Sequence, residues 1–452
     1  MALFLVAQWR GWRPSPRTTL AVGIAFRVAV WILATINSWQ PFDFADDFSA
    51  AASAVLHHQD PLLTGRTGGW HFLPPMALVF AGELWFCYAV HLPWQLVGRL
   101  VSVVADVALI PLVGRLAPDR GRLRSFQYAC NPLSIMICAI HAQIEPEMLA
   151  FAVAAFVVAR SRRGRAATGR GPGILMGLSM AMGTWTVLLL PGLLRSLPGR
   201  VRRIRAATWA VIVPAVALLS SPLTVGTPVA KLPTVFTTLI SAQPLVGDWG
   251  WTVIATGGQE VFSAALTKPG KLILVAALLV AAYLWRRAAP IDLTMALVIT
   301  FLIFTPRFGD QYLMWVLPFL IARRTRFGTQ AIVLAAVWTG IGELYLGPMS
   351  PAAWQHAHVW WAYGSLAAIG SLLLALSGIS RRAPEPGLQP AAVTTVGSAP
   401  SPGTLEAPSP AAPEPEPVAA RPQSRQVPEP ALTGRPEPPR GSAPEKELTP
   451  PG

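Results

Sequence analysis

Four aspartates stand close together near the start of the chain, and the segment that carries them is where we expect chemistry. They are Asp43, Asp46, Asp47 and Asp60, in a sequence with only 22 acidic residues among 452. Carboxylates are expensive beside a lipid bilayer, so several of them at one surface of an apolar protein usually have a function there. The first three could also hold a divalent cation, although no His or Cys cluster supports a dedicated metal site.

The composition identifies the class of protein that must position these acids. The chain is 53% hydrophobic and 13% charged, and its mean hydropathy is +0.47. Continuous apolar runs near the length of a hydrocarbon core recur from Thr18 to about Ser380. The pattern predicts an all-α polytopic membrane protein, because the strands of a membrane β-barrel would alternate in segments of roughly ten residues.

The basic residues indicate an orientation rather than nucleic-acid binding. The formal net charge is +14, but the arginines fall in clusters between the apolar runs. Such clusters are typical of cytoplasmic loops. We therefore predict a multi-pass protein of the cell membrane with both termini in the cytoplasm, and segment 40–73 becomes its first outer loop. Cys87, Cys130 and Cys138 show no metal spacing and are interpreted as packing residues.

The chain divides into three regions. Residues 1–17 are expected to form a cytoplasmic N-terminus, and 18–380 a transmembrane domain of about ten to twelve helices with a second long outer loop at 223–268. Residues 381–452 are rich in Pro, Ala and Glu and are predicted to be a disordered cytoplasmic tail. The expected crossings are 18–36, 96–114, 125–141, 148–158, 209–220, 271–284, 292–305, 312–321, 330–345 and 359–377.

Two apolar stretches do not fit simple crossings. If Pro74 to Val90 spanned the bilayer, the arginine-rich loop at 115–124 would lie outside, so we predict a re-entrant or interfacial helix there. The stretch from Gly173 to Leu194 is interrupted at Gly183 and flanked by arginines, which predicts a hairpin of short or broken helices.

Several short motifs occur in a recognisable order. After Asp43-Phe44-Ala45-Asp46-Asp47-Phe48 come an alanine-rich run, Gln59-Asp60-Pro61-Leu62 and Phe72-Leu73-Pro74-Pro75. Asp106 lies in a later apolar run, and Asn131-Pro132-Leu133 with His141-Ala142-Gln143-Ile144-Glu145 and Gln311-Tyr312-Leu313-Met314-Trp315 follow. This order resembles the GT-C glycosyltransferases, in particular the polyprenol-phosphate-mannose-dependent mannosyltransferases of actinobacteria and the catalytic subunit of the first GPI mannosyltransferase.

The chain also departs from that family at identifiable positions. Ala142 and Glu145 stand where relatives carry a glycine and an aspartate. Gly183-Thr184-Trp185-Thr186 stands where many carry a lysine.

The resemblance implies a GT-C-like bundle and an inverting transfer of a sugar, with mannose the expected one. The donor would be a polyprenyl-phosphate sugar, the acceptor a lipid or glycan at the outer face, and the surroundings membrane lipids. One carboxylate suffices as general base, because the lipid phosphate is already a good leaving group. Asp46 or Asp47 is the first choice and Asp43 stands behind them, while the alternative is that these aspartates cap the alanine-rich helix.

The leaving phosphate requires a cation at the outer surface. Arg307 and Arg66 are the candidates, because Arg makes bidentate contacts to phosphate, and the alternative is pairing with nearby carboxylates. His71 and His141 could bind phosphate or sugar, or could be hydrogen-bonded structural residues.

Three further polar residues complete the predicted donor site. Gln143 and Glu145 could hold sugar hydroxyls or satisfy the ends of broken helices, and Gln311 belongs to the late motif of the resemblance.

Two rival functions remain open from the sequence. A transporter or flippase of a lipid-linked sugar would line a path through the midplane, yet most ionisable residues avoid the centres of the apolar runs, with Asp106 and Glu343 among the exceptions. An inactive relative could instead organise other enzymes through the tail.

Overall fold

The protein is almost entirely helical in the part that the structure describes. The computed structural model describes residues 1–37, 41–64, 70–161, 168–240, 245–247, 249–259 and 261–382. Within these ranges the exception is a two-stranded antiparallel ladder, in which β1 (Leu245–Val246) pairs with β2 (Val261–Phe262). The all-α prediction is confirmed at this level. The predicted tail lies outside the described residues from 383 onward, as does Arg66.

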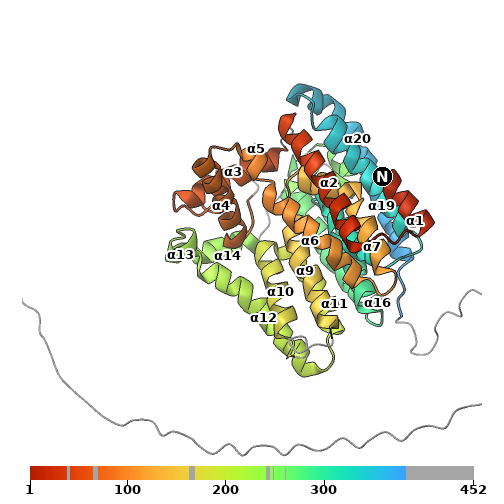
Figure 1. The fold of residues 1–452 in the computed structure, drawn as a ribbon. Coiled ribbons are helices and arrows are strands. Elements are labelled where there is room, and N and C mark those ends of the chain that lie inside the picture. Colours follow the sequence, from red (N-terminus) through yellow and green to blue (C-terminus); the bar gives the residue numbers. More distant parts are fainter. Residues whose placement is uncertain are drawn as a thin grey trace, which may run out of the picture. The chain divides into compact units, whose positions relative to one another are not determined.

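Figure 1 shows how the helices are arranged. The first ten are α1 (Ala2–Arg10), α2 (Pro16–Ile36), α3 (Ser49–Leu56), α4 (Pro74–Val90), α5 (Trp94–Val97), α6 (Leu100–Leu116), α7 (Gly121–Ala129), α8 (Pro132–Ala139), α9 (Glu145–Arg160) and α10 (Arg170–Met182). The others are α11 (Leu190–Ser196), α12 (Arg200–Leu219), α13 (Ser221–Thr224), α14 (Leu232–Ile240), α15 (Val253–Thr256), α16 (Ala264–Leu284), α17 (Pro290–Phe304), α18 (Leu317–Ala322), α19 (Gly328–Ile341) and α20 (Pro351–Ser377).

Six short segments among the described residues have tighter or wider helical turns. The 3₁₀ segments are η3 (Thr184–Leu189), η4 (Val229–Lys231), η5 (Gly250–Thr252) and η6 (Asp310–Trp315). The π segments, which are rare in proteins and often occur at functional sites, are η1 (Asp43–Phe48) and η7 (Gly342–Leu346).

Five helices in the described residues are long and apolar enough to cross a membrane. They are Pro16–Ile36, Trp94–Leu116, Ala265–Leu284, Gly328–Leu346 and Ala353–Ser377. Each coincides with a predicted crossing, and large apolar side chains face outward on them: Leu272 is 72% exposed and Leu279 67%. A surface of this kind suits contact with lipid chains. The total of ten to twelve crossings stays a prediction, as does the expectation that α4 does not cross.

The predicted crossing at 125–141 is two helices rather than one. Helix α7 ends at Ala129, and α8 begins at Pro132. Proline cannot donate a backbone hydrogen bond, so it favours the first turn of a new helix. Asn131 caps that helix, because its side-chain oxygen accepts hydrogen bonds from the backbone N–H groups of Leu133 and Ser134 at 2.9 and 3.4 Å. The interruption predicted at Gly183 is present, where α10 ends and η3 begins.

The first loop has a hydrophobic core of its own. Phe48 stacks on Phe80 of α4 with ring centroids 4.7 Å apart, and Phe44 stacks on Trp94 at 5.5 Å. These aromatic rings form a cluster that is separate from the main core of the bundle. Helices α3, α4 and α5 accordingly lie together at one side of the molecule in Figure 1. The buried rings fix η1 and therefore the directions of its aspartates.

A buried ion pair joins α2 to α6, and its hydrogen bonds extend to Tyr128 of α7 and Ser134 of α8. Arg27 and Asp106 are both 0% exposed, and Arg27 Nε donates to Asp106 Oδ2 at 2.6 Å. Tyr128 donates to the other oxygen of Asp106 at 2.5 Å, and Arg27 also donates to Ser134 Oγ at 3.1 Å. The network positions α8 and hence the turn that follows it, which carries His141.

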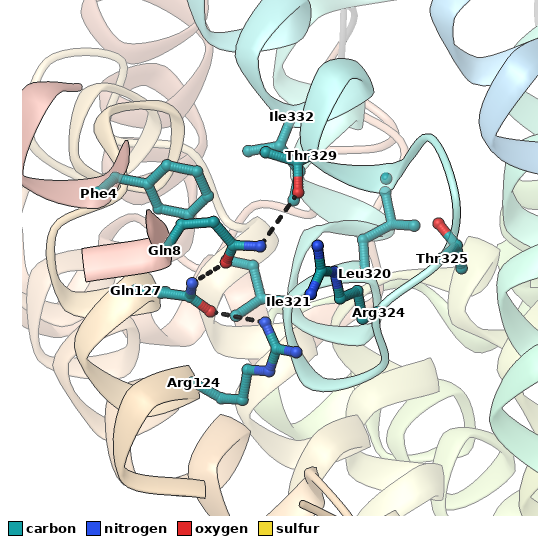
Figure 2. A pocket seen from close by; sticks show the side chains of 11 residues that line it. Phe4, Gln8, Arg124, Gln127, Leu320, Ile321, Arg324, Thr325, Thr329 and Ile332 are labelled. Carbon is teal, nitrogen blue, oxygen red and sulfur yellow. Dashed lines mark hydrogen bonds between the residues drawn. The ribbon is translucent and has the colours of Figure 1, made fainter. Parts of the chain in front are cut away.

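The N-terminal segment contains a helix that the sequence did not predict. Helix α1 packs on α7, and Figure 2 shows its polar contacts beside a notch of about 10 Å³. Gln127 donates to Gln8, and Gln8 donates to Thr329 at 3.4 Å. A space of that volume holds about one water molecule. The notch is therefore a packing feature rather than a substrate site.

Candidate functional site

A cavity of about 330 Å³ brings most of the predicted site residues together. Its volume falls within the range of roughly 300–1,000 Å³ that is usual for small-molecule sites. Of the ten predicted site residues, seven line it: Asp43, Asp47, His71, Gln143, Glu145, Arg307 and Gln311. They come from the first loop, the turn before α9 and the segment between α17 and α18, which are far apart in the sequence.

The first loop supplies the acidic wall of the cavity. Asp47 is only 7% exposed, whereas its neighbour Asp46 is exposed and does not line the cavity. The two adjacent residues point differently because successive positions of a helical turn lie on different faces. Asp43 also lines the cavity, and its Oδ2 accepts a hydrogen bond from Gln143 Nε2 at 2.8 Å. Asp43 and Asp47 are therefore the carboxylates of η1 that a ligand in the cavity could contact.

Two cations line the same cavity. Arg307 lies in the turn after α17, where Thr305 Oγ1 donates to the Arg307 carbonyl at 2.9 Å and accepts from its N–H at 3.3 Å. Within the described residues Arg307 forms no ion pair with a carboxylate. Lys271 of α16 is the second cation, which the sequence places at the start of a predicted crossing without indicating a site. Its position in the sequence, at the outer end of a predicted span, was the available signal.

Aromatic side chains form a further part of the wall. Trp185 of η3 stacks on Trp315 of η6 with ring centroids 3.8 Å apart and planes within 1° of parallel. Tyr312 and Phe301 pack against the same Trp315 ring at 4.5 and 5.4 Å. Flat aromatic faces suit contact with the apolar faces of a ring-shaped ligand. The segment containing Thr184 and Trp185, where the resemblance leads us to expect a lysine, therefore does face the cavity.

Glu145 is a buried acid whose pKa lies near neutral pH. It begins α9, is 3% exposed, and accepts a hydrogen bond from Trp315 Nε1 at 3.4 Å. Burial raises the pKa of Glu145 to about 7, against the lowering effects of its hydrogen bonds. Its Oε2 has no hydrogen-bond partner within the described part of the chain. A ligand hydroxyl in the cavity could satisfy that oxygen.

His141 lies outside the cavity lining and is hydrogen-bonded to another side chain, which agrees with the second of the two alternatives that the sequence leaves open. Its Nδ1 is 2.6 Å from Glu343 Oε1 of η7. Burial alone would lower the pKa of His141, but the charge and hydrogen bond of Glu343 outweigh it and raise the pKa to about 10. The imidazole is therefore protonated at neutral pH. Asp310 lies beside this pair, and burial followed by the charge of Glu343 raises the pKa of Asp310 to about 8.

The first-loop aspartates do not gather into a cation site in the structure. Among the described residues, the His, Cys, Asp and Glu side chains close enough to share an ion are His141, Asp310 and Glu343. Asp43 instead engages Gln143, and Asp60 has a structural role. Asp60 Oδ1 accepts from Leu62 N–H at 2.9 Å, and its Oδ2 accepts from Thr227 at 2.5 Å, which ties the first loop to the segment after α13.

Comparison of the sequence with protein-family models and with curated proteins found no match.

Proposed function

We propose that the protein is a membrane glycosyltransferase of the GT-C type, which moves a sugar from a polyprenyl-phosphate donor to a lipid or glycan acceptor at the outer face of the membrane. The observation that carries the proposal is one cavity lined by carboxylates of the first loop and by two cations that are distant from them in the sequence, Lys271 of α16 and Arg307 of the turn after α17. Acid–base chemistry and phosphate binding require opposite charges, and this cavity offers both.

The base would be Asp43 or Asp47. Transfer with inversion forms a bond between the acceptor oxygen and the anomeric carbon as the bond to the lipid phosphate breaks. The acceptor hydroxyl loses its proton to the carboxylate during that step. A positioned general base contributes about 10²- to 10⁴-fold to the rate of such a step. Gln143 holds Asp43 by a hydrogen bond of 2.8 Å, which would fix the orientation of that carboxylate.

Arg307 and Lys271 would hold the phosphate that leaves. A cation preorganised beside a leaving phosphate stabilises the charge that develops on it and also binds the donor. The turn around Arg307 is held by its own hydrogen bonds to Thr305. The sugar would lie between these cations and the acids, beside the aromatic side chains that line the cavity, with its hydroxyls within reach of Glu145.

The test is a transfer assay with matched variants of the first loop. Purified protein in proteoliposomes is incubated with radiolabelled polyprenyl-phosphate-mannose and a cell-envelope lipid extract. Asp47→Asn and Asp43→Asn preserve size and hydrogen bonding, and loss of the base should lower turnover by about a hundredfold or more for one of them. Asp46→Asn is the matched control, because Asp46 is exposed and outside the cavity, and it should retain nearly full turnover.

Arg307→Ala should behave differently from the aspartate variants. Loss of a phosphate contact weakens donor binding and also raises the barrier to departure of the phosphate, so KM should rise and kcat should fall. If Asp43→Asn and Asp47→Asn both retain the turnover of Asp46→Asn, the transferase proposal fails. Movement of the labelled lipid between leaflets without a new product would then favour the flippase interpretation.

A further inference from the structure

Three metal-ligating side chains meet beside the cavity. His141 comes from the turn between α8 and α9, Asp310 begins η6, and Glu343 lies in the π turn η7. One ligand atom of each lies within 4.8 Å of those of the other two. Asp310 is 2% exposed and Glu343 7%, so water competes little for these oxygens.

We propose that His141, Asp310 and Glu343 form a binding site for a divalent d-block metal ion, with Zn²⁺ or Mn²⁺ as the best fit. The site goes beyond the proposed transferase activity, because its three residues do not line the substrate cavity. An imidazole nitrogen with two carboxylates suits Zn²⁺ or Mn²⁺, whereas Mg²⁺ and Ca²⁺ prefer ligands that are all oxygen.

The geometry needs only small side-chain movements to bind an ion. Metal–ligand bonds of about 2.1 Å place two ligands of a tetrahedral ion about 3.4 Å apart. The His141 and Glu343 atoms are 2.6 Å apart, so that contact would open by roughly 0.8 Å as the metal replaces the shared proton. Glutamate has the rotatable bonds for such a shift, and η7 and η6 need not move.

The surroundings are rich in carboxyl groups whose ionised form a dication would stabilise. Asp43 acts electrostatically on His141, and so does the Glu145 carboxylate, which is 3% exposed and has an oxygen without a partner in the described part of the chain. Arg99 is the guanidinium that acts on Glu343. Carboxyl groups thus outnumber the cationic side chains around the three ligands, and a nearby positive charge favours the ionised form of a carboxyl group.

The metal would have a positioning role toward the cavity. His141 is two residues before Gln143, which holds Asp43, and Asp310 precedes Gln311 of the cavity lining. An ion that joins these two turns to η7 would therefore fix both sides of the acidic wall.

The test measures metal binding without any donor lipid. The full chain is purified, stripped with a chelator and titrated with Zn²⁺, Mn²⁺ and Mg²⁺ by calorimetry, and bound metal is counted by mass spectrometry. We expect about one Zn²⁺ per chain, a rise in unfolding temperature on adding it, and weak Mg²⁺ binding. Co²⁺ should give the visible absorption of a site with mixed nitrogen and oxygen ligands. Since donor lipid is absent, failure of the transferase proposal would leave this result unaffected.

The variants separate a built site from adventitious binding. His141→Ala and the isosteric Glu343→Gln should each weaken Zn²⁺ binding by about a hundredfold or more. His356→Ala is the control, because His356 is an exposed histidine of α20. Equal Zn²⁺ binding in wild type, Glu343→Gln and His356→Ala would overturn the proposal, as would the absence of bound metal in the wild type. If His141→Ala fails to fold, Glu343→Gln and the Co²⁺ spectrum of the wild type still decide it.

Discussion

The substitution Asp106→Asn should destabilise the helical bundle more than Asp292→Asn, which also removes one charge of an ion pair. Arg27 uses all of its donors in the buried network. Nε and Nη2 face Asp106 Oδ2 at 2.6 and 2.5 Å, Nη1 donates to two backbone carbonyls at 2.9 and 3.0 Å, and Nη2 also reaches Ser134. Both partners are 0% exposed, so neither charge can reach water when the other is lost.

The expected cost follows from that burial. Asp106→Asn keeps the shape but removes the negative charge, which leaves a buried guanidinium without a counter-ion. Breaking a buried pair in this way costs about 3–5 kcal/mol. The double variant Arg27→Met with Asp106→Leu removes both charges and should recover most of the loss, because apolar replacements of a whole buried pair are often neutral.

The measurement is the free energy of unfolding by titration with a denaturing detergent, followed by tryptophan fluorescence. Asp292→Asn is the matched control, since its partner Arg323 is 27% exposed and can turn toward water. That variant should lose about 1 kcal/mol or less. A loss below about 1 kcal/mol for Asp106→Asn, or a double variant no more stable than the single one, would contradict this account of the pair.

Two further predictions concern packing and pH. Gly173→Ala should cost about 1–3 kcal/mol, because the new Cβ would lie 2.5 Å from the carbonyl oxygen of Ala206 and 2.8 Å from its Cα, whereas Gly370→Ala meets nothing within 4 Å and should be nearly neutral. The pKa of His141 is raised from 6.5 to about 10, so the stability advantage of the wild type over His141→Gln should be full below pH 6.5 and vanish as pH rises through about 10. Thermal unfolding with chelator present measures it, and a difference independent of pH would refute it.

The sequence predicted the features that depend on local composition. An apolar run of sufficient length forms a helix whatever its neighbours, so the five long apolar helices were predictable, and a glycine interruption was visible at Gly183. The division of residues 125–141 was also available locally, since Asn131 before Pro132 is a strong helix-start signal. The overall apolar length of the segment favours a single crossing, but the cap is the stronger signal.

The convergence of residues on the cavity depended on packing that composition does not encode. Lys271 faces the cavity because α16 packs on α17 in one particular rotation, and nothing within α16 specifies it. Glu343 joins His141 across 202 positions of sequence. The choice between Asp46 and Asp47 likewise depends on the burial of Phe48 against α4 and of Phe44 against α5, which turns one carboxylate inward and the other outward.

The backbone at Ala142 is strained, and this position is one at which the chain departs from the resembled motif. Ala142 stands where the motif leads us to expect glycine, and its φ is +55°, in the left-handed region that glycine enters without penalty. A non-glycine residue there costs roughly 1–2 kcal/mol, so surrounding contacts must hold the turn. Those contacts are His141 with Glu343 on one side and Gln143 with Asp43 on the other. The strained turn therefore couples the proposed metal site to the acidic wall of the cavity, and a ligand that binds at either place should stabilise the other.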